Sequence, residues 1–332
     1  VDLKTQEGRD LVRQLLVTAD IVIENFRPGV MENWGLDPES LRQDNPSLIY
    51  ARISGYGQSG PYAKKPGFAS ACEGISGFRY LNGYPDEVPV RPNLSLGDSV
   101  SGLHAVIGIM MALRARDQKT DEEPAQGQVV DVALYESMFN LLEAVIPEYH
   151  GADIIRQPSG TTVTGIVPTN TYKCSDGKHL VIGGNGDSIF TRLMQAIGRG
   201  DIAANESYAT NADRVLHETE IDTVLKAWCA NHTLADALTF LEFHRVPCGP
   251  VYNAKDMMND QHFNERGLFE QVEINGEYLK IPAILPKLDN TPGGTEWPGP
   301  ELGSHTDEVL VGLGLDEKAI ADLKASGVIA DS

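Results

Sequence analysis

The sequence predicts an α/β protein with a large domain built on a parallel sheet and a second, smaller α+β domain. Two patterns predict this organisation. In the first half of the chain, short apolar strand segments alternate with helical segments, as in a parallel sheet covered by helices. Beyond residue 150 this alternation gives way to two hairpin patterns with Asp-Gly and Asn-Gly turns. A chain of 332 residues with 41% apolar residues can bury a core in more than one domain.

The large domain is expected over residues 1–150. Each of its elements follows from apolar periodicity and from Gly and Pro breakers between the elements. Residues 55–67, rich in Gly and Pro, form a long loop of the kind that often has a function. The expected helices are 5–17, 36–45, 68–81, 98–116 and 134–147, and the expected strands are 20–24, 47–54 and 128–134.

The second domain is expected over residues 171–285, after a linker or lid at residues 151–170. Its hairpins are predicted at 171–184 and 268–283, with two or three helices between residues 187 and 242. Residues 286–332 then form a long connection and a last pair of helices.

Charge and composition exclude several classes of partner. The net charge is −20 and the pI is near 4.7, whereas a protein that binds nucleic acid needs a basic face, so we expect no nucleic acid. No uninterrupted apolar run approaches about 20 residues, so we expect no membrane partner. The four cysteines are far apart and no secretory signal is evident, which predicts reduced thiols and a cytoplasmic location. The eight histidines show no ligand spacing, so we expect no metal.

The segment ENFRPG, residues 24–29, directly follows a predicted parallel strand. Open α/β sheets bind ligands at the carboxyl ends of their strands. Asn25 and Arg27 therefore stand where a ligand is expected, and the guanidinium fork of Arg27 suits a phosphate. A solvated turn is equally compatible with this segment, so both interpretations stay open.

Asp98 also has two interpretations. It begins an apolar helical stretch within SLGDSVSGLHAVIGIMMAL, residues 95–113, where an aspartate is an ordinary N-cap. However, Gly97 precedes it and Gly102 follows one turn later, and glycines allow close approach of a ligand. A helix N-terminus also keeps a carboxylate ionised, and such a carboxylate can attack an activated acyl group. The spacing alone leaves the cap and the nucleophile open.

Longer stretches of the chain resemble the family III CoA-transferases, the CaiB/BaiF superfamily that includes formyl-CoA transferase. The matching segments follow the family order along the whole chain. They include DIVIENFRPGV (20–30), ISGYGQSGPYAKKPGF (53–68), GDSVSGLHAVIGIMMAL (97–113) and GQVVDVALYESMFNL (127–141). The resemblance implies a Rossmann-like large domain to which residues 286–332 return, and a homodimer of two interlocked rings.

The resemblance also implies roles for particular residues. Asp98 matches the aspartate that attacks an acyl-CoA thioester and then carries CoA as an aspartyl thioester. Coenzyme A is thus part of the substrate, with succinyl-CoA as a candidate donor and a dicarboxylic acid as the favoured acceptor. Residues 159–168 match a loop that closes over the intermediate. The residues that match CoA-binding positions are Val1, Lys4, Asn25, Phe26, Arg27 and Phe68.

Departures from the family pattern separate the possible functions. Racemases of the superfamily have His-Asp where this chain has Phe68-Ala69. Phe68 cannot carry a proton, whereas racemisation needs two positioned proton carriers, so this change disfavours racemase activity. An α-methylacyl-CoA racemase or epimerase is therefore kept as the alternative function only. A non-catalytic CoA-binding relative is a further alternative. An arginine that contacts CoA in the family falls near the position of Asn33 in this chain, so that phosphate contact is missing from the pattern. Members of the family also have an N-terminal segment, with the first strands of the sheet, ahead of the position of Val1.

Two arginines are candidates for holding a second carboxylate of the acceptor. They are Arg79 and Arg91, although an ordinary surface position is the favoured interpretation of either one.

Overall fold

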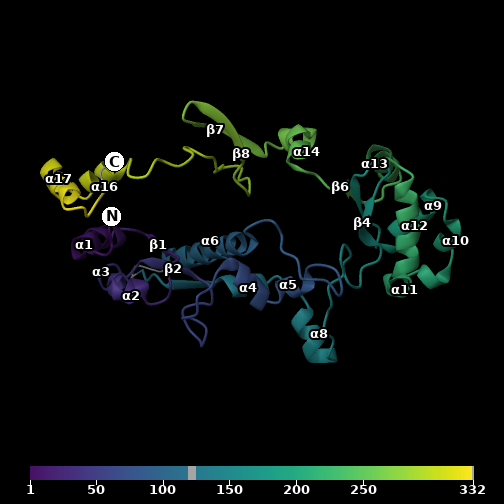
Figure 1. Cartoon of the computed structure of the whole chain (residues 1–332), viewed down its shortest axis with the longest axis horizontal. Helices are drawn as coiled ribbons and strands as arrows, with labels where there is room; N and C mark the ends of the chain where they lie inside the picture. Colours follow the sequence, from purple (N-terminus) through teal and green to yellow (C-terminus); the bar gives the residue numbers. More distant parts are fainter. Residues whose placement is uncertain (119–124, 331–332) are drawn as a thin grey trace. The chain divides into compact units, whose positions relative to one another are not determined.

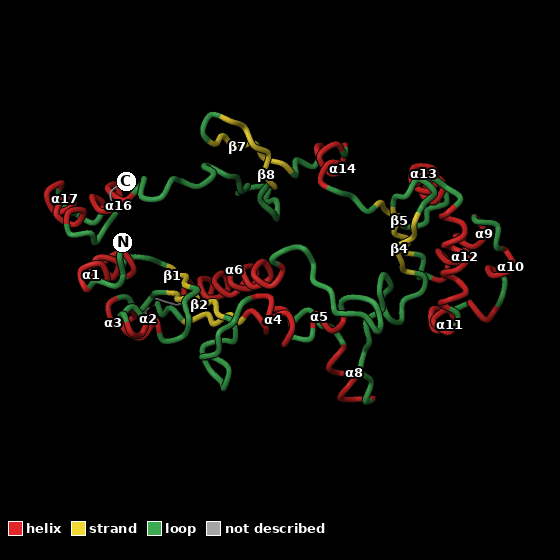
Figure 2. Tube along the Cα trace, in the orientation of Figure 1, coloured by secondary structure: helices red, strands yellow, loops and turns green. Residues whose placement is uncertain are grey.

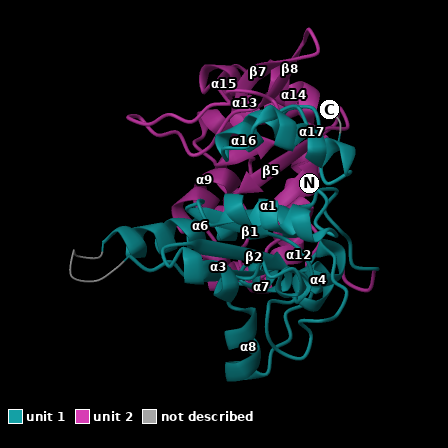
Figure 3. Ribbon diagram, turned by 90° about the vertical axis from the view of Figure 1, so that its left-hand side faces the viewer, with its two compact units in different colours: residues 1–82, 88–157, 300–332 teal, residues 83–87, 158–299 magenta. Residues whose placement is uncertain are grey.

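The computed structural model describes residues 1–118 and 125–330, which fall into two compact units (Figure 3). Unit 1 comprises residues 1–82, 88–157 and 300–332, and unit 2 comprises residues 83–87 and 158–299. Each unit is described by itself below.

The two units differ in detail from the domain boundaries expected from the sequence. Residues 151–157, which we expected in the linker or lid, group with unit 1. Residues 286–299, expected in the returning C-terminal segment, group with unit 2. The expected domain boundaries remain a prediction.

A parallel three-stranded sheet forms the centre of unit 1, as the alternation of strands and helices predicts. It consists of β1 (Ile21–Glu24), β2 (Ile49–Ser54) and β3 (Val129–Ala133), in the order β1-β2-β3. Ile21 pairs with Ile49, and Tyr50 pairs with Val129. The three strands therefore end at one edge of the sheet, the edge at which open α/β sheets bind ligands.

Helices connect and cover these strands (Figure 2). Side chains cap the first turns of two of them: the Thr5 hydroxyl accepts the Gly8 N–H at 3.0 Å, and the Asp37 carboxylate accepts the Ser40 N–H at 3.0 Å. The helices of unit 1 are α1 (Gln6–Leu16), α2 (Val30–Asn33), α3 (Pro38–Asp44), α4 (Ala69–Ile75), α5 (Phe78–Leu81), α6 (Leu96–Asp117), α7 (Leu134–Phe139), α8 (Val145–Ala152), α16 (Thr306–Gly312) and α17 (Glu317–Ala325).

Two segments that the sequence predicted as one continuous helix each are divided into two helices in the structure. The helix predicted over 68–81 is divided into α4 and α5, because Gly77 adopts a φ of 87° that a continuous helix does not allow. The helix predicted over 134–147 is divided into α7 and α8, and Glu143 between them has a φ of 51°.

The long helix α6 runs antiparallel to the sheet strands. Near its C-terminal end, the Arg116 guanidinium pairs with Asp20, which precedes β1, at 2.8 Å. In its middle, Gly108 packs so closely on Val130 that a Cβ atom at Gly108 would lie 2.6 Å from that side chain. The N-terminal end of α6 therefore points toward the edge where the strands end, and Figure 1 shows α6 lying along the strands.

Helix α6 is also the one helix of the described residues that is long and apolar enough to span a membrane: it has 22 residues, and an 18-residue stretch of it has a mean hydropathy of 1.5. The core helix of a soluble protein meets the same two criteria. The expectation of no membrane partner remains a prediction.

Unit 1 packs its helices through three apolar clusters. The first joins the sheet to the helices between its strands and includes Val22, Leu41 and Tyr50, all buried. The second joins α1 to the C-terminal helices through Leu11, Leu310 and neighbouring side chains. The C-terminal helices thus pack against the N-terminal helix within one unit. The third joins α4 to α7, and its buried residues are Ala69, Cys72 and Leu134.

Unit 2 contains two small antiparallel sheets. The first has β4 (Thr169–Lys173), β5 (His179–Gly183) and β6 (Cys248–Pro250), in that order. The hairpin predicted over 171–184 is confirmed, and β6 is a strand that the sequence prediction missed. The second sheet is the predicted hairpin, with strands β7 (Phe269–Ile274) and β8 (Glu277–Pro282).

Helices form most of the rest of unit 2. The helices of unit 2 are α9 (Asp187–Ala196), α10 (Gly200–Ala203), η1 (Glu206–Tyr208), α11 (Asn211–Leu216), α12 (Glu218–Ala230), α13 (Leu234–Phe243), α14 (Ala254–Asn259) and α15 (Gln261–Glu265). The prediction of two or three helices between residues 187 and 242 is wrong, because two short α-helices and one 3₁₀ helix lie between α9 and α12 in addition to the three longer helices.

Candidate active site

A buried ion pair holds the loop after β1, the segment that contains Asn25, Phe26 and Arg27. Arg52, on β2, donates from Nε to the Glu24 carboxylate at 2.7 Å, and both side chains are less than one-tenth exposed. The other Glu24 oxygen accepts the Phe26 N–H at 2.7 Å. The carboxylate therefore fixes the first turn of the loop, and the guanidinium offsets its charge.

A second carboxylate closes the loop from its far side. The Arg52 guanidinium also donates to Glu32 of α2, from Nη1 at 2.7 Å and from Nη2 at 3.2 Å. The Gly29 N–H donates to the same carboxylate at 3.0 Å. The hydrogen bond from Arg52 lowers the pKa of Glu32, against an opposing effect of burial. For Arg52, burial lowers the pKa, but its bonds to Glu32 and Glu24 outweigh that effect and raise it overall.

The three predicted ligand-binding side chains of this loop are exposed. The Phe26 ring is 41% exposed and packs edge-on against Trp34, with ring centroids 5.3 Å apart. Asn25 and Arg27 are exposed, and within the described residues neither side chain makes a hydrogen bond or an ion pair. The loop thus presents a rigid backbone with an uncommitted guanidinium, the arrangement suited to binding an anionic group.

Asp98 lies in the first turn of α6 and is exposed. The cap position belongs to Ser95, whose side chain makes no capping bond. The interpretation of Asp98 as an N-cap is therefore wrong, because the helix begins two residues earlier than predicted. Within the described residues the Asp98 carboxylate accepts no hydrogen bond from another group, so its oxygens are open to solvent or substrate.

The backbone just before Asp98 is held on three sides. The Gly97 N–H donates to the Glu73 carboxylate of α4 at 3.3 Å. The Gly97 carbonyl accepts the Ser101 hydroxyl at 2.7 Å. A Cβ atom on Gly97 would lie 3.3 Å from the Ala69 Cβ, so the glycine lets α4 pack closely on the start of α6.

Phe68 precedes Ala69 directly and is the N-terminal flanking residue of α4, so the structure brings it into the neighbourhood of Gly97 and Asp98. Its side chain is 78% exposed. The predicted loop at residues 55–67 closes just before it, where Gly55 and Gly67 approach so closely that a Cβ on Gly55 would lie 3.1 Å from the Gly67 Cα. This narrow neck sets the position from which Phe68 projects.

Cys72 of α4 lies beneath the same helix start and is buried. Its thiol donates to the Gly55 carbonyl at 3.2 Å. Burial, and then the charges of Asp98 and Glu73, raise the pKa of the Cys72 thiol. A neutral thiol is a poor nucleophile, so Asp98 is the group at this position that is equipped to attack an acyl carbon.

Val1 and Lys4 are placed elsewhere on unit 1. Both are exposed, and Val1 lines a cavity of about 250 Å³ together with residues of the C-terminal segment such as Pro300 and His305. In the described part of the chain, no hydrogen bond or ion pair joins either residue to the loop after β1 or to Asp98. Their predicted contact with CoA remains a prediction.

The two arginines considered for a second acceptor carboxylate have different surroundings. Arg79 is already paired with Glu73, donating to Oε2 from Nε at 3.1 Å and from Nη2 at 3.0 Å. Arg91 is exposed, and its one side-chain hydrogen bond among the described residues is to the Leu94 carbonyl, at 3.4 Å. The Arg79 guanidinium is therefore bonded to the buried Glu73 carboxylate and is not free to bind an acceptor carboxylate, a pairing that the sequence did not indicate.

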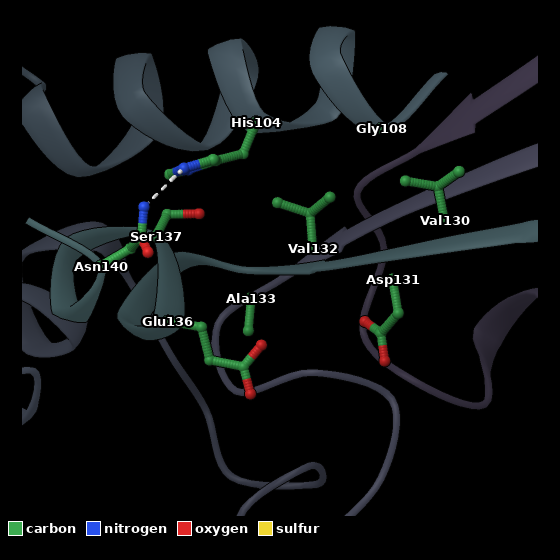
Figure 4. Close-up of a pocket in the computed structure, with 9 residues that line it drawn as sticks. All are labelled: His104, Gly108, Val130, Asp131, Val132, Ala133, Glu136, Ser137 and Asn140. Atoms are coloured by element: carbon green, nitrogen blue, oxygen red, sulfur yellow. Dashed lines mark hydrogen bonds between the residues drawn. The ribbon is translucent and has the colours of Figure 1, made fainter. Parts of the chain in front are cut away.

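A cavity of about 360 Å³ lies further along α6, away from the predicted residues (Figure 4). His104 points toward Asn140, with His104 Nε2 and Asn140 Nδ2 3.3 Å apart, and His104 Nδ1 is buried without a partner in the described residues. Asp131 points to the opposite face of β3, where its carboxylate accepts the Gln58 N–H at 3.0 Å. Asp98 does not line this cavity, and no sequence motif had indicated it.

The predicted lid, residues 159–168, belongs to unit 2. Its exposed tip is a tight turn in which Val163 and Ile166 form a single β-bridge. Asn211 holds it from α11, donating to the Gly165 carbonyl at 2.8 Å and accepting the Val167 N–H at 3.0 Å. Among residues 1–118 and 125–330, no group of three or more His, Cys, Asp or Glu side chains could hold a metal ion.

Comparison with known proteins agrees with this description. The profile of the family described as CoA-transferase family III matches residues 1–306. A succinyl-CoA–D-citramalate CoA-transferase of Chloroflexus aurantiacus is 42% identical over 99% of this chain and 81% of its own length. A succinate–glutarate CoA-transferase of Agrobacterium fabrum is 36% identical over 94% of this chain and 77% of its own length.

A solved structure supports the same assignment at the level of the fold. A CaiB/BaiF family protein from Brucella suis superposes with a TM-score of 0.80 and 31% identity, over 94% of this chain and 80% of that chain. The resemblance seen in the sequence motifs is thereby confirmed over essentially the whole chain. The chain belongs to CoA-transferase family III.

Proposed function

We propose that this chain transfers CoA from an acyl-CoA to a carboxylic acid, with Asp98 as the covalent nucleophile. The observation that carries the proposal is its 42% identity, over 99% of the chain, to a succinyl-CoA–D-citramalate CoA-transferase. Relatives named for malate and glutarate support the same reaction class.

The position of Asp98 supports its role. It is exposed in the first turn of α6, at the end of the helix that points toward the carboxyl edge of the parallel sheet. The partial positive charge of a helix N-terminus favours the ionised form of a carboxylate there. An ionised and unpaired carboxylate can attack a thioester carbonyl.

The reaction proceeds in four balanced steps. A carboxylate oxygen of Asp98 attacks the thioester carbonyl, the C–S bond breaks, and an acyl-aspartyl anhydride and CoA thiolate form. The thiolate attacks the Asp98 carbonyl and releases the donor acid, which leaves an aspartyl-CoA thioester. The acceptor carboxylate attacks this thioester and forms a second anhydride and a thiolate. The thiolate then attacks the acceptor carbonyl, which gives the new acyl-CoA and restores the Asp98 carboxylate.

The substrate class follows from the relatives. Succinyl-CoA is the proposed donor, and the proposed acceptor is a dicarboxylic acid of the size of citramalate, malate or glutarate. Neither substrate requires a metal for the four steps.

The CoA portion is proposed to lie along the loop after β1. The Arg27 guanidinium is exposed and uncommitted, and it can form charge-assisted hydrogen bonds with phosphate. Phe26 offers an exposed ring beside it, and Asn25 offers an amide. Val1, Lys4 and Phe68 are proposed as further contacts.

Trapping the intermediate tests this proposal. The full chain is mixed with succinyl-CoA without acceptor and treated with hydroxylamine, which converts an aspartyl thioester or anhydride into a hydroxamate. Peptide mass spectrometry is expected to find the modification at Asp98 and to lose it in Asp98→Ala. Transfer activity is expected to fall by about 10⁴-fold or more in that variant.

A matched control lies on the same helix. Asp117→Asn removes a carboxylate at the opposite end of α6 and is expected to leave both modification and transfer unchanged. An unmodified Asp98 with succinyl-CoA and with other acyl-CoAs would refute the nucleophile. Solvent deuterium entering the α-carbon of a branched acyl-CoA would then favour a racemase, and tight binding without either reaction would favour a non-catalytic relative.

We also propose that the chain works as a homodimer in the cytoplasm. Exposed apolar side chains on one helix and one hairpin support an additional protein surface, since monomers rarely expose large apolar patches. They include Leu103, Val106, Met110 and Met111 of α6 and Tyr278 and Leu279 of β8. The four free cysteines support a reducing compartment.

A further inference from the structure

We propose that Glu73 is a positioning residue for Asp98 and that Arg79 offsets the charge of Glu73 so that it can act in this way. This inference rests on the proposed role of Asp98. Neither residue touches the reacting atoms; both act through the backbone at the start of α6.

The contacts of Glu73 carry the proposal. Its side chain is 0% exposed and lies on α4, packed against α6. One carboxylate oxygen accepts the Gly97 N–H, and the other accepts both Nε and Nη2 of Arg79. Both oxygens are thus committed, one to the helix start and one to the guanidinium.

The start of α6 lacks its own side-chain cap. The first N–H groups of a helix have no partner within it, and the side chain of Ser95 at the cap position does not satisfy one. Glu73 supplies the missing acceptor from another helix. It bonds the residue directly before Asp98, so its position determines where the Asp98 backbone stands.

Charge explains why Arg79 is part of the arrangement. The Glu73 side chain is fully buried beside the helix start that carries Asp98, and a buried charge without a partner is unfavourable. The Arg79 guanidinium bonds Glu73 through two nitrogens and also reaches the Ser70 hydroxyl at 2.5 Å. Glu73 can therefore cap the helix without adding an uncompensated charge beside the nucleophile.

The chemistry of Asp98 makes this positioning important. A nucleophile must lie within about 3–3.5 Å of the carbonyl it attacks, and a displacement of about 1 Å can slow the reaction by about 100-fold. Because Gly97 is held through its N–H, its carbonyl and its packing on Ala69, loss of the Glu73 contact frees one of three restraints.

The test measures formation of the Asp98 adduct by rapid quench of the full chain with succinyl-CoA. In Glu73→Gln, the amide can place its oxygen toward Gly97 or toward Arg79, but its NH₂ then faces a donor. We expect adduct formation to slow by about 10- to 100-fold, with the dissociation constant for succinyl-CoA unchanged.

A double variant provides the rescue. In Glu73→Gln/Arg79→Met the amide oxygen can accept the Gly97 N–H, and its NH₂ no longer meets the guanidinium. We expect its adduct rate to return to within about 5-fold of the unmodified chain. A merely structural loss would not be repaired by removing a second buried contact.

The single variant Arg79→Met gives a second readout. It removes both guanidinium bonds to Glu73 Oε2, so the Glu73 side chain loses the partner that orients it toward Gly97. We expect adduct formation to slow by about 3- to 10-fold, with the dissociation constant for succinyl-CoA unchanged.

Glu148→Gln is the matched control, because it removes a carboxylate that pairs with Arg156 in the same unit, away from α6. It is expected to leave the adduct rate unchanged. An unchanged adduct rate in Glu73→Gln, or a double variant that is no faster than Glu73→Gln, would overturn the inference. If Glu73→Gln does not fold, the adduct rate of Arg79→Met decides. Absence of any adduct in the unmodified chain would instead refute the proposed function.

Discussion

Each unit contains one deeply buried arginine that holds a turn after a strand, and the two arginines are bonded differently. Arg52 in unit 1 is paired with two carboxylates, Glu24 and Glu32. Arg214 in unit 2 is 0% exposed and donates mainly to backbone carbonyls, with Asp187 as its one charged partner among the described residues. The carbonyls that accept from Arg214 belong to Val167, Asn185, Tyr208 and Ala209.

The difference shows in the segments that the arginines hold. The turn held by Arg214, residues 183–186, leads from β5 into α9, and the Phe190 ring of α9 packs against the guanidinium at 4.7 Å. Arg52 holds a loop whose side chains Asn25 and Arg27 are exposed and make no hydrogen bond or ion pair with residues 1–118 and 125–330. A buried guanidinium can therefore stabilise either a turn within the core or a loop that binds a ligand. Which of the two it does depends on whether the backbone it restrains carries side chains that are free to bind.

The largest expected effect is on stability in unit 2. Arg214→Met leaves several buried carbonyls without a donor, and breaking a buried network of this kind costs about 3–5 kcal/mol. Urea denaturation would measure the loss, and hydrogen exchange is expected to increase in residues 183–187 and 208–217. The KM for succinyl-CoA of the folded fraction should not change. An unchanged midpoint would contradict the assignment of Arg214 as the central contact of this turn.

Arg52→Met is expected to lose less stability and to affect binding. It leaves the Glu24 carboxylate buried without its partner, at a cost of about 2–4 kcal/mol. Because the loop after β1 loses its restraint, the KM for succinyl-CoA is expected to rise by about 10-fold while kcat changes little.

The double variant Glu24→Gln/Arg52→Met removes both buried charges and is expected to recover most of the stability but not the KM. If the double variant recovered both the stability and the KM, or if Arg52→Met left the KM unchanged, Arg52 would have the same purely structural role as Arg214.

The smallest expected effect concerns pH. The folded pKa of Glu32 is lowered from its ordinary value of 4.5, mainly by Arg52. A lowered carboxylate pKa contributes stability that is present above pH 4.5 and is lost as pH falls through the folded value. Since Glu32 is partly exposed, screening keeps this contribution below about 1 kcal/mol.

Urea midpoints of the unmodified chain and of Glu32→Gln should therefore differ at pH 6 and converge in acid. If the difference between the two urea midpoints stayed constant with pH, the ion pair between Glu32 and Arg52 would not stabilise the loop.

Much of unit 1 was predictable from local pattern. The three strands, their parallel arrangement and the helices α1 and α3 follow from apolar periodicity and from the Gly and Pro breakers between the elements. Division of the helix predicted over 68–81 was harder to predict, since its apolar pattern continues across the Gly77 break. The start of α6 was misplaced for a related reason: Asp98 has the composition of a cap, whereas Ser95 occupies that position.

The candidate site divides in the same way. The motifs located Asp98 at a helix start and Arg27 after a strand, because both positions depend on chain order and on residue type. The restraints on these residues join segments far apart: Arg52 lies 28 residues from Glu24, and Gly97 lies 24 residues from Glu73. A buried charge is stable only beside its partner, and which partner it meets depends on how helices and strands pack. Periodicity within one segment carries no record of that packing, so these pairings, and the cavity beside His104, became visible only in the folded chain.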